Sequence, residues 1–223
     1  MTPPAPDRPD LADRRESREA ALTPSQLAGD TTSRLLSYLS IAFGVYVALQ
    51  TLLMVVLSQS PIPFADQWDD IISGRKITLS YLFSQHNEHR LLFSRLVFIV
   101  DHFISKENGA VSATISVILQ LTLAATIYYN FIKNRLIISP FELWVAGFIF
   151  TCLFWSGQWE NFTWGYQIVF FGVILAAAIT FTLLTRGAGS MITPLLVIAV
   201  EFLATYTLAS GIIVPFMTVA LAV

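Results

Sequence analysis

Charge is scarce in this sequence, and long stretches of the chain carry none. Charged residues make up 13% of the 223 residues, whereas hydrophobic residues make up 55%. Soluble domains carry about 25% charged residues, and most of these cover the protein surface. The scarcity therefore excludes a soluble globular domain of this length and indicates an integral membrane protein.

Other missing features argue against three further classes of protein. The net charge is −2 and the sequence has no basic stripe, so we expect no nucleic-acid partner. Cys152 is the one cysteine, so no intrachain disulfide can form, and we expect it to be a small buried packing residue. Apolar residues do not alternate with the period of a strand, which argues against a membrane β-barrel.

Uncharged runs separate the charged segments and are long enough to cross a membrane as helices. A transmembrane helix needs about 20 predominantly apolar residues. We therefore predict an all-α membrane protein with six transmembrane helices, over residues 35–58, 111–131, 140–155, 166–185, 191–209 and 212–223. Because the sequence stops inside an apolar run, we expect the natural chain to be longer.

The first 34 residues differ from the rest of the chain. They are rich in Pro, Asp, Arg and Ala and lack the apolar residues needed to form a core, so we predict a disordered tail over residues 1–34. Five arginines lie in this tail, and the positive-inside rule then places the N-terminus in the cytoplasm. The apolar run that follows is too long for a cleaved signal peptide, so it is expected to be the first span.

The half-polar stretch over residues 59–110 is predicted to be a long extracytoplasmic loop. Within it, residues 91–104 are apolar but short for a span, and they include Arg95 and Asp101. A helix lying in the membrane interface fits this segment better. If the segment crossed the membrane instead, the later basic residues would all move outside, against the positive-inside rule. These residues are Lys133, Arg135 and Arg186.

An acidic motif opens this loop. Asp66, Asp69 and Asp70 occupy positions i, i+3 and i+4, so on a helix their carboxylates share one face. Like charges so close repel one another, an arrangement that suits a general base or a bound divalent cation. The alternative is a helix start, where acids are favoured by the helix dipole. We expect no other cofactor.

A second polar motif follows in the same loop. His86 and His89 flank Glu88 and precede Arg90. Two histidines at this spacing can bind a metal, but the metalloprotease pattern HExxH is absent, and we predict no metal site here. We favour a recognition segment, in which Arg90 binds a phosphate and the histidines donate hydrogen bonds. The alternative is a solvated turn.

Aromatic residues crowd the segment between the third and fourth predicted spans. Trp159, Glu160, Trp164 and Tyr166 lie within eight positions of one another. Tryptophans beside a carboxylate can stack on a sugar and hydrogen-bond its hydroxyls. The alternative is an aromatic belt at the membrane interface.

One carboxylate lies inside a predicted span. Glu201 is near the middle of residues 191–209. Carboxylates inside a membrane are costly, so they default to a functional role and an interior partner, but no basic residue of the predicted spans is an obvious mate.

Together these features resemble the GT-C class of polyprenyl-phosphate-sugar-dependent glycosyltransferases. That class has one span, a long outer loop with an acidic motif, interfacial helices and many further spans. The resemblance implies that Asp66 is the catalytic base and that a sugar moves from a polyprenyl-phosphate donor to an extracytoplasmic acceptor. His86 to Arg90 replace the short basic motif of those enzymes, and no Lys-Pro-Pro is present.

Three motifs also resemble a group of bacterial polytopic membrane proteins. They are Pro63-Phe-Ala-Asp66-Gln-Trp68-Asp69, Gln85-His86-Asn87-Glu88-His89-Arg90 and Gln158-Trp159-Glu160-Asn161. This second resemblance implies a bacterial plasma (inner) membrane, whose lipid bilayer surrounds the spans. The competing prediction is a non-enzymatic protein, either a transporter that uses Glu201 or an assembly subunit.

Overall fold

A computed structural model of the chain is almost entirely helical. It describes residues 24–60, 62, 65–70, 76–132, 138–187 and 190–222, with the backbone alone at residues 24–29, 65, 66, 70 and 222. Four described segments are long and apolar enough to cross a membrane: Asp30–Leu57, Ala110–Phe131, Pro140–Thr163 and Gly165–Arg186. The prediction of a multi-pass α-helical membrane protein is thereby confirmed.

The remaining apolar helices are shorter than the predicted spans. The segments Thr193–Thr205 and Ala209–Leu221 fall below the length of a full span, so the count of six stays a prediction. The first helix, in contrast, is longer than expected. Helix α2 runs over Pro24–Leu57, so residues 24–34, which we placed in the tail, are helical. Residues 1–23 lie outside the described part of the chain.

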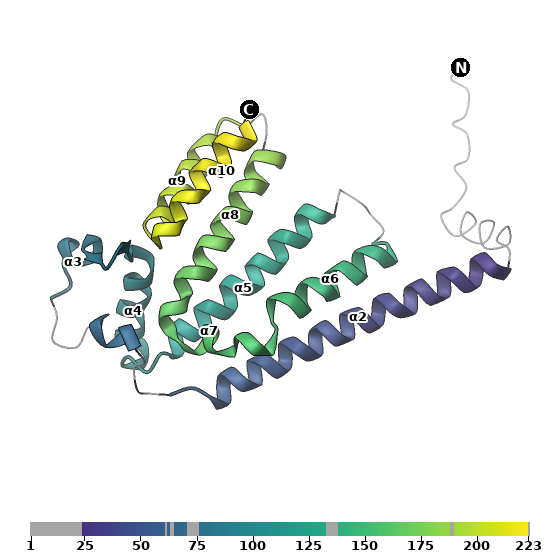
Figure 1. Cartoon of the computed structure of the whole chain (residues 1–223), viewed down its shortest axis with the longest axis horizontal. Helices are drawn as coiled ribbons and strands as arrows, with labels where there is room; N and C mark the ends of the chain where they lie inside the picture. Colours follow the sequence, from purple (N-terminus) through teal and green to yellow (C-terminus); the bar gives the residue numbers. More distant parts are fainter. Residues whose placement is uncertain are drawn as a thin grey trace, which may run out of the picture.

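The long helices lie side by side in one layer (Figure 1). Helix α2 packs on α6 (Pro140–Leu153), α6 on α5 (Ala110–Phe131), and α5 on α8 (Ile168–Arg186). The layer continues from α8 to two shorter helices, which are α9 (Thr193–Thr205) and α10 (Ile213–Ala222).

Hydrogen bonds between neighbouring helices mark the two ends of the layer. The Thr51 hydroxyl donates to the Phe154 carbonyl at 2.6 Å, at the end of the layer where α2 ends and α5 begins. We call this the loop end. At the opposite end, which we call the turn end, Arg186 donates to the carbonyls of Asn130 and Ile132 at 3.1 and 2.8 Å. The chain between α2 and α5 therefore leaves and rejoins the layer at the loop end.

That connecting segment carries short elements at the loop end. They are η1 (Ala65–Asp70), α3 (Leu79–Phe83), the hairpin strands β1 (Gln85–His86) and β2 (His89–Arg90), and α4 (Leu92–Ser105). Residue 87 turns the hairpin with a φ of 48°, a left-handed conformation that asparagine tolerates well. Helix α4 has 14 residues and is not among the segments long enough to span.

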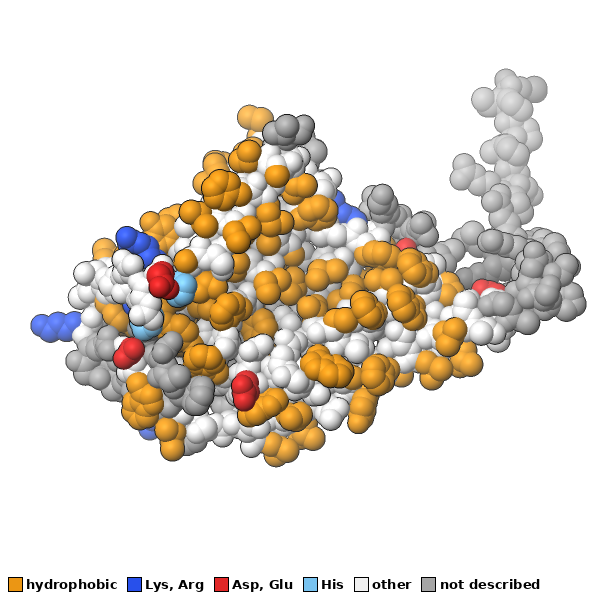
Figure 2. All heavy atoms as spheres, in the orientation of Figure 1, with side chains coloured by type: hydrophobic (Ala, Val, Ile, Leu, Met, Phe, Trp, Pro, Cys, Tyr) orange, Lys and Arg blue, Asp and Glu red, His pale blue; other side chains and the backbone are white. Residues whose placement is uncertain are grey.

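The outer surface differs between the layer of long helices and the loop end. Figure 2 shows hydrophobic side chains spread over the layer, while histidines and several acidic and basic side chains gather at the end that carries α3 and α4. Large apolar side chains are exposed along every long helix, including Leu49, Tyr129, Phe148 and Ile174. Such a surface is stable in lipid rather than in water.

Candidate functional site

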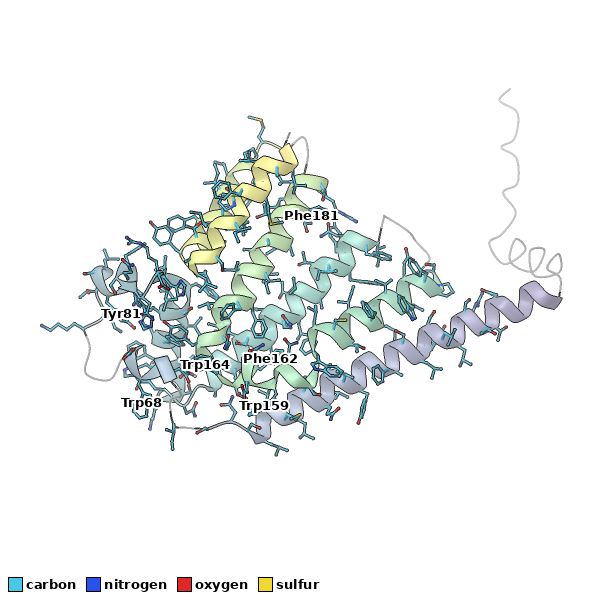
Figure 3. The ribbon with its side chains drawn as sticks, viewed as in Figure 1. Trp68, Tyr81, Trp159, Phe162, Trp164 and Phe181 are labelled. Carbon is cyan, nitrogen blue, oxygen red and sulfur yellow. The ribbon has the colours of Figure 1, made fainter. Side chains whose placement is uncertain are left out.

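The aromatic segment after α6 folds back at the loop end. It forms η2 (Ser156–Gln158), α7 (Trp159–Thr163) and η3 (Gly165–Gln167). Phe154 and Phe162 are completely buried, and their rings stack with centroids 5.8 Å apart. These two anchors hold α7 against the layer, so its remaining residues face a space at the loop end. Figure 3 shows Trp159 and Trp164 on this side, together with Trp68 and Tyr81.

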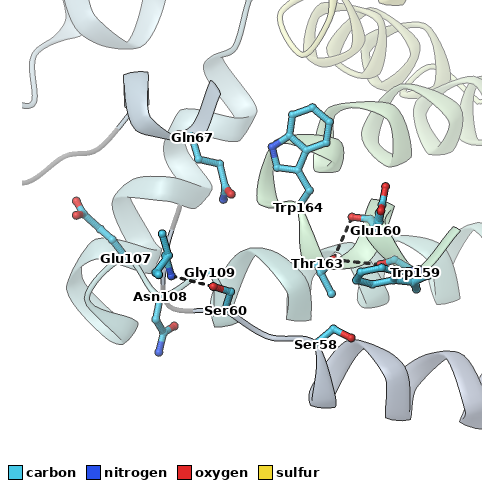
Figure 4. A pocket seen from close by; sticks show the side chains of 11 residues that line it. Ser58, Ser60, Gln67, Glu107, Asn108, Gly109, Trp159, Glu160, Thr163 and Trp164 are labelled. Atoms are coloured by element: carbon cyan, nitrogen blue, oxygen red, sulfur yellow. Dashed lines mark hydrogen bonds between the residues drawn. The ribbon is translucent and has the colours of Figure 1, made fainter. Parts of the chain in front are cut away.

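This space is a pocket of about 360 Å³. Its walls come from three parts of the chain: the segment after α2, the turn between α4 and α5, and α7 (Figure 4). The lining residues are Ser58, Ser60, Ile62, Gln67, Glu107, Asn108, Gly109, Trp159, Glu160, Thr163 and Trp164. Of the predicted sugar-contacting residues, the structure thus brings Trp159, Glu160 and Trp164 into one pocket.

Two acidic residues lie on different walls of this pocket, and the Glu107 carboxylate is turned away from the other lining residues (Figure 4). Glu107 lies in the α4–α5 turn with a φ of 65°, and its Oε1 is 3.0 Å from His102 Nδ1. Glu160 is exposed on α7. Sequence reasoning found Glu160 because it adjoins a tryptophan, whereas nothing in the sequence connects Glu107 to the aromatic segment.

Gln67, which lies within the acidic motif, lines the pocket. A Cβ added to Gly165 would lie 2.6 Å from Gln67 Nε2, so this amide lies directly against the glycine. Element η1 packs against η3 through this contact. Asp69 is exposed, and the side chains of Asp66 and Asp70 lie outside the described residues. Their predicted catalytic roles therefore stay predictions.

The polar motif of residues 86–90 forms the hairpin and contacts two distant elements. The His86 ring lies 5.4 Å from the ring of buried Tyr166, which also neighbours Trp164 at 6.4 Å. His89 Nδ1 accepts a hydrogen bond of 3.3 Å from the backbone N–H of Ala209, so its ring proton sits on Nε2. The hairpin is thereby fixed to the turn between α9 and α10.

Glu88 and Arg90 point away from these contacts. Both side chains are exposed, and Arg90 Nη1 donates to the Phe83 carbonyl at 3.1 Å. Their predicted contacts with substrate are not tested by this geometry.

Arg95 is a buried arginine whose role was missed from the sequence. We expected it at the membrane interface, but it is only 3% exposed. Its Nη1 donates to the carbonyls of Tyr81 at 2.9 Å and Ser84 at 2.5 Å, and its guanidinium lies 5.0 Å from the Tyr81 ring centre. Arg95 therefore holds the C-terminal end of α3. Its position one helical turn from Leu91 and Phe98, on an apolar helix face, was the available signal.

The carboxylate that was predicted to lie inside a span has a neutral partner. Glu201 Oε1 accepts a hydrogen bond from the Thr218 hydroxyl, which joins α9 to α10. The Thr205 hydroxyl donates to the Glu201 carbonyl at 2.9 Å. The interior partner of this carboxylate is thus a hydroxyl group of the next helix and not a basic residue.

A metal site is not formed by the side chains that the structure describes. Within residues 30–221, apart from the gaps given above, no group of three or more His, Cys, Asp and Glu side chains is placed to hold an ion. Because two of the three acidic side chains of residues 66–70 fall outside that description, the divalent cation stays a prediction.

Comparisons with known proteins add no relative. No family model, no curated protein and no solved structure matches this chain. What the chain does must therefore be argued from its own residues, above all from the pocket at the loop end.

Proposed function

We propose that this protein is a membrane glycosyltransferase that moves a sugar from a polyprenyl-phosphate donor to an extracytoplasmic acceptor. One observation carries the proposal: two tryptophans, two acidic residues and two amides line one pocket at the end of the layer that also bears η1. Aromatic rings with a few convergent polar groups are the usual lining of a small-molecule site.

The chemistry follows from the residues assigned to the site. Asp66 takes the proton of an acceptor hydroxyl, and that oxygen attacks the anomeric carbon of the sugar. The bond from this carbon to the phosphate oxygen breaks, and the phosphate leaves with the electron pair. Arg90, with His86 or His89, stabilises the growing negative charge on the phosphate. Trp159 and Trp164 contact the sugar, whereas Tyr166, which was also predicted to contact it, is buried and is not a lining residue of the pocket.

The distribution of basic residues supports the orientation. In this proposal the loop end faces the extracytoplasmic side of a bacterial plasma membrane. Of the 13 basic residues of the sequence, eight precede residue 35, lie between α5 and α6 or end α8, and five lie in residues 59–110. The positive-inside rule favours the cytoplasm for the turn end, and thus for the N-terminus.

A conservative change of the acidic motif tests the enzyme. We expect Asp66→Asn to abolish sugar transfer from a polyprenyl-phosphate donor in reconstituted membranes, because an amide cannot take the acceptor proton. Expression, membrane insertion and thermal unfolding should match the parent protein. The control is Asp30→Asn, which alters a carboxylate at the opposite end of α2. Near-normal transfer by the Asp66 variant would refute this role.

A transporter is the alternative, and it is supported by Glu201 in the apolar helix α9. In that case Glu201→Gln would abolish substrate uptake into proteoliposomes, and Asp66→Asn would leave it unchanged. The same two variants therefore separate the two functions.

A further inference from the structure

We infer that the loop-end pocket holds an uncharged sugar ring and keeps anionic groups, including phosphate, outside it. This inference rests on the proposed function, because it names the part of the substrate that enters the same site. It is argued from the charge, the polar groups and the size of the pocket.

The charge of the lining residues is negative. Glu107 and Glu160 are the acidic residues of two different walls. The Glu107 side chain is only 18% exposed, and its carboxylate is held toward His102, which lies behind the lining residues. Partly buried carboxylates repel a phosphate or a uronic acid more strongly than exposed ones, because the surrounding protein screens less than water does.

The arginines of the loop end that the structure describes are engaged elsewhere. Arg90 donates to the Phe83 carbonyl, and Arg95 donates to carbonyls at the end of α3. Neither residue is part of the lining. An anionic leaving group is therefore better placed at the hairpin, beside Arg90, than in the pocket.

The remaining lining suits the two faces of a sugar. Donors and acceptors both remain among Ser58, Ser60, Asn108 and Thr163. The Asn108 amide oxygen accepts from the Ala110 N–H and leaves its NH2 group as a donor, whereas the Thr163 hydroxyl donates to backbone carbonyls and still accepts. Sugar hydroxyls need partners of both kinds. The C–H face of the ring is apolar, and an aromatic side chain such as Trp159 covers such a face well. Figure 4 shows the Trp159 ring beside Glu160, opposite the wall that carries Asn108.

The volume fits one ring. Small-molecule pockets range over about 300–1,000 Å³, and the pocket lies near the lower limit at about 360 Å³. The lipid part of a donor has no room there. It would instead lie along the exposed apolar helices.

Binding of small probes tests this inference without any transfer reaction. The full chain, purified into lipid nanodiscs, is titrated with methyl glycosides of glucose, galactose, mannose and arabinose, followed by saturation-transfer NMR. Glucuronate, inorganic phosphate and methyl glucosaminide are titrated in parallel. We expect at least one neutral glycoside to bind saturably at millimolar concentration, and glucuronate and phosphate to bind at least tenfold more weakly.

Two variants and a matched control locate the site. Trp159→Ala should weaken binding of the neutral glycoside at least tenfold, whereas Trp144→Ala, on the exposed face of α6 away from the pocket, should leave it unchanged. Glu160→Gln should strengthen glucuronate binding relative to the neutral probe by about fivefold or more, because it removes a repelling charge.

Each outcome decides the inference. Equal or tighter binding of phosphate or glucuronate by the parent protein overturns it. So does binding of the ammonium-bearing glucosaminide alone, or no saturable binding of any neutral glycoside. Saturable neutral binding without sugar transfer would keep the inference and reject the proposed enzyme. Sugar transfer by a protein that binds charged and neutral probes equally well would keep the proposed enzyme and reject the inference.

Discussion

Asp101 shows how one buried side chain organises the loop end. It is 5% exposed in α4, and its carboxylate accepts hydrogen bonds from the backbone N–H groups of Gly109 and Val111 at 3.1 and 2.9 Å. Gly109 precedes α5 and has no side chain to cap it. Asp101 thus caps α5 from the preceding helix and fixes the turn that carries Glu107 into the pocket.

Removing this carboxylate should destabilise the protein. We expect Asp101→Ala to lower the free energy of unfolding by about 2–4 kcal/mol, because each buried N–H left without an acceptor costs about 1–3 kcal/mol. Denaturant titration in detergent micelles measures the change. Asp69→Ala, an exposed carboxylate on η1, should change the value by less than about 0.5 kcal/mol. Equal effects of the two variants would contradict the capping role.

At this scale the sequence predicted neighbours along the chain better than neighbours in space. Trp159, Glu160 and Trp164 could be grouped because they lie in one short segment. Gln67 and Glu107 join them from loops that carry no pattern indicating where they meet. Arg95 was misplaced because its charge suggested water, although carbonyls at the end of α3 replace the water.

Among the helices, α2 and α6 make the closest contact. A Cβ added to Gly44 would lie 2.5 Å from the Gly147 carbonyl oxygen, and one added to Gly147 would lie 2.3 Å from the backbone carbon of Ser40. Small residues permit such close approach of membrane helices, whose association depends on packing rather than on the hydrophobic effect.

Valine at this crossing should force the two helices apart. We expect Gly147→Val to reduce the free energy of unfolding by about 1–3 kcal/mol, since the backbone of α2 would have to shift. Cys152 is exposed on the same helix as Gly147, so the prediction that it is buried is wrong. The matched control is Cys152→Val, which adds bulk at this exposed position and should be nearly neutral. If both variants unfold at the same denaturant concentration as the parent, the close crossing is wrong.

Helix ends were predicted well where charge or capping residues mark them. The predicted spans of α5, α6 and α8 agree with the structure within about two residues, and α6 starts where Ser139 and Glu142 form a capping box. The start of α2 was missed because residues 24–34 are polar and give no hydropathy signal. Pro24 at the first helical position was the available indication.

The whole molecule is a layer with charged groups at its two ends and apolar side chains between them (Figure 2). Hydropathy predicted the helices, but it could not predict their lateral order, because all of them are apolar. That order depends on close contacts such as the one between Gly44 and Gly147, which have no regular spacing in the sequence. The order in turn decides which loops share the pocket.

The two ends should lie on opposite sides of the membrane. Glu88 in the hairpin and Ser190 in the turn before α9 are exposed at the loop end and the turn end. In a Cys152→Ser background, we expect a membrane-impermeant maleimide to label Glu88→Cys, but not Ser190→Cys, in intact cells. Both positions should react after permeabilisation. Labelling of both from outside would contradict the topology.

The hydrogen bond from Ala209 to His89 joins residues 120 positions apart. A ribosome adding about 5–20 residues per second makes the hairpin roughly 6–24 seconds before the turn to which it binds. During that interval the hairpin has emerged but lacks the backbone N–H that holds His89. The order of synthesis therefore makes the turn after α9 the part that secures the hairpin, and a ribosome that stalls before Ala209 would leave an inserted chain in which His89 lacks this bond.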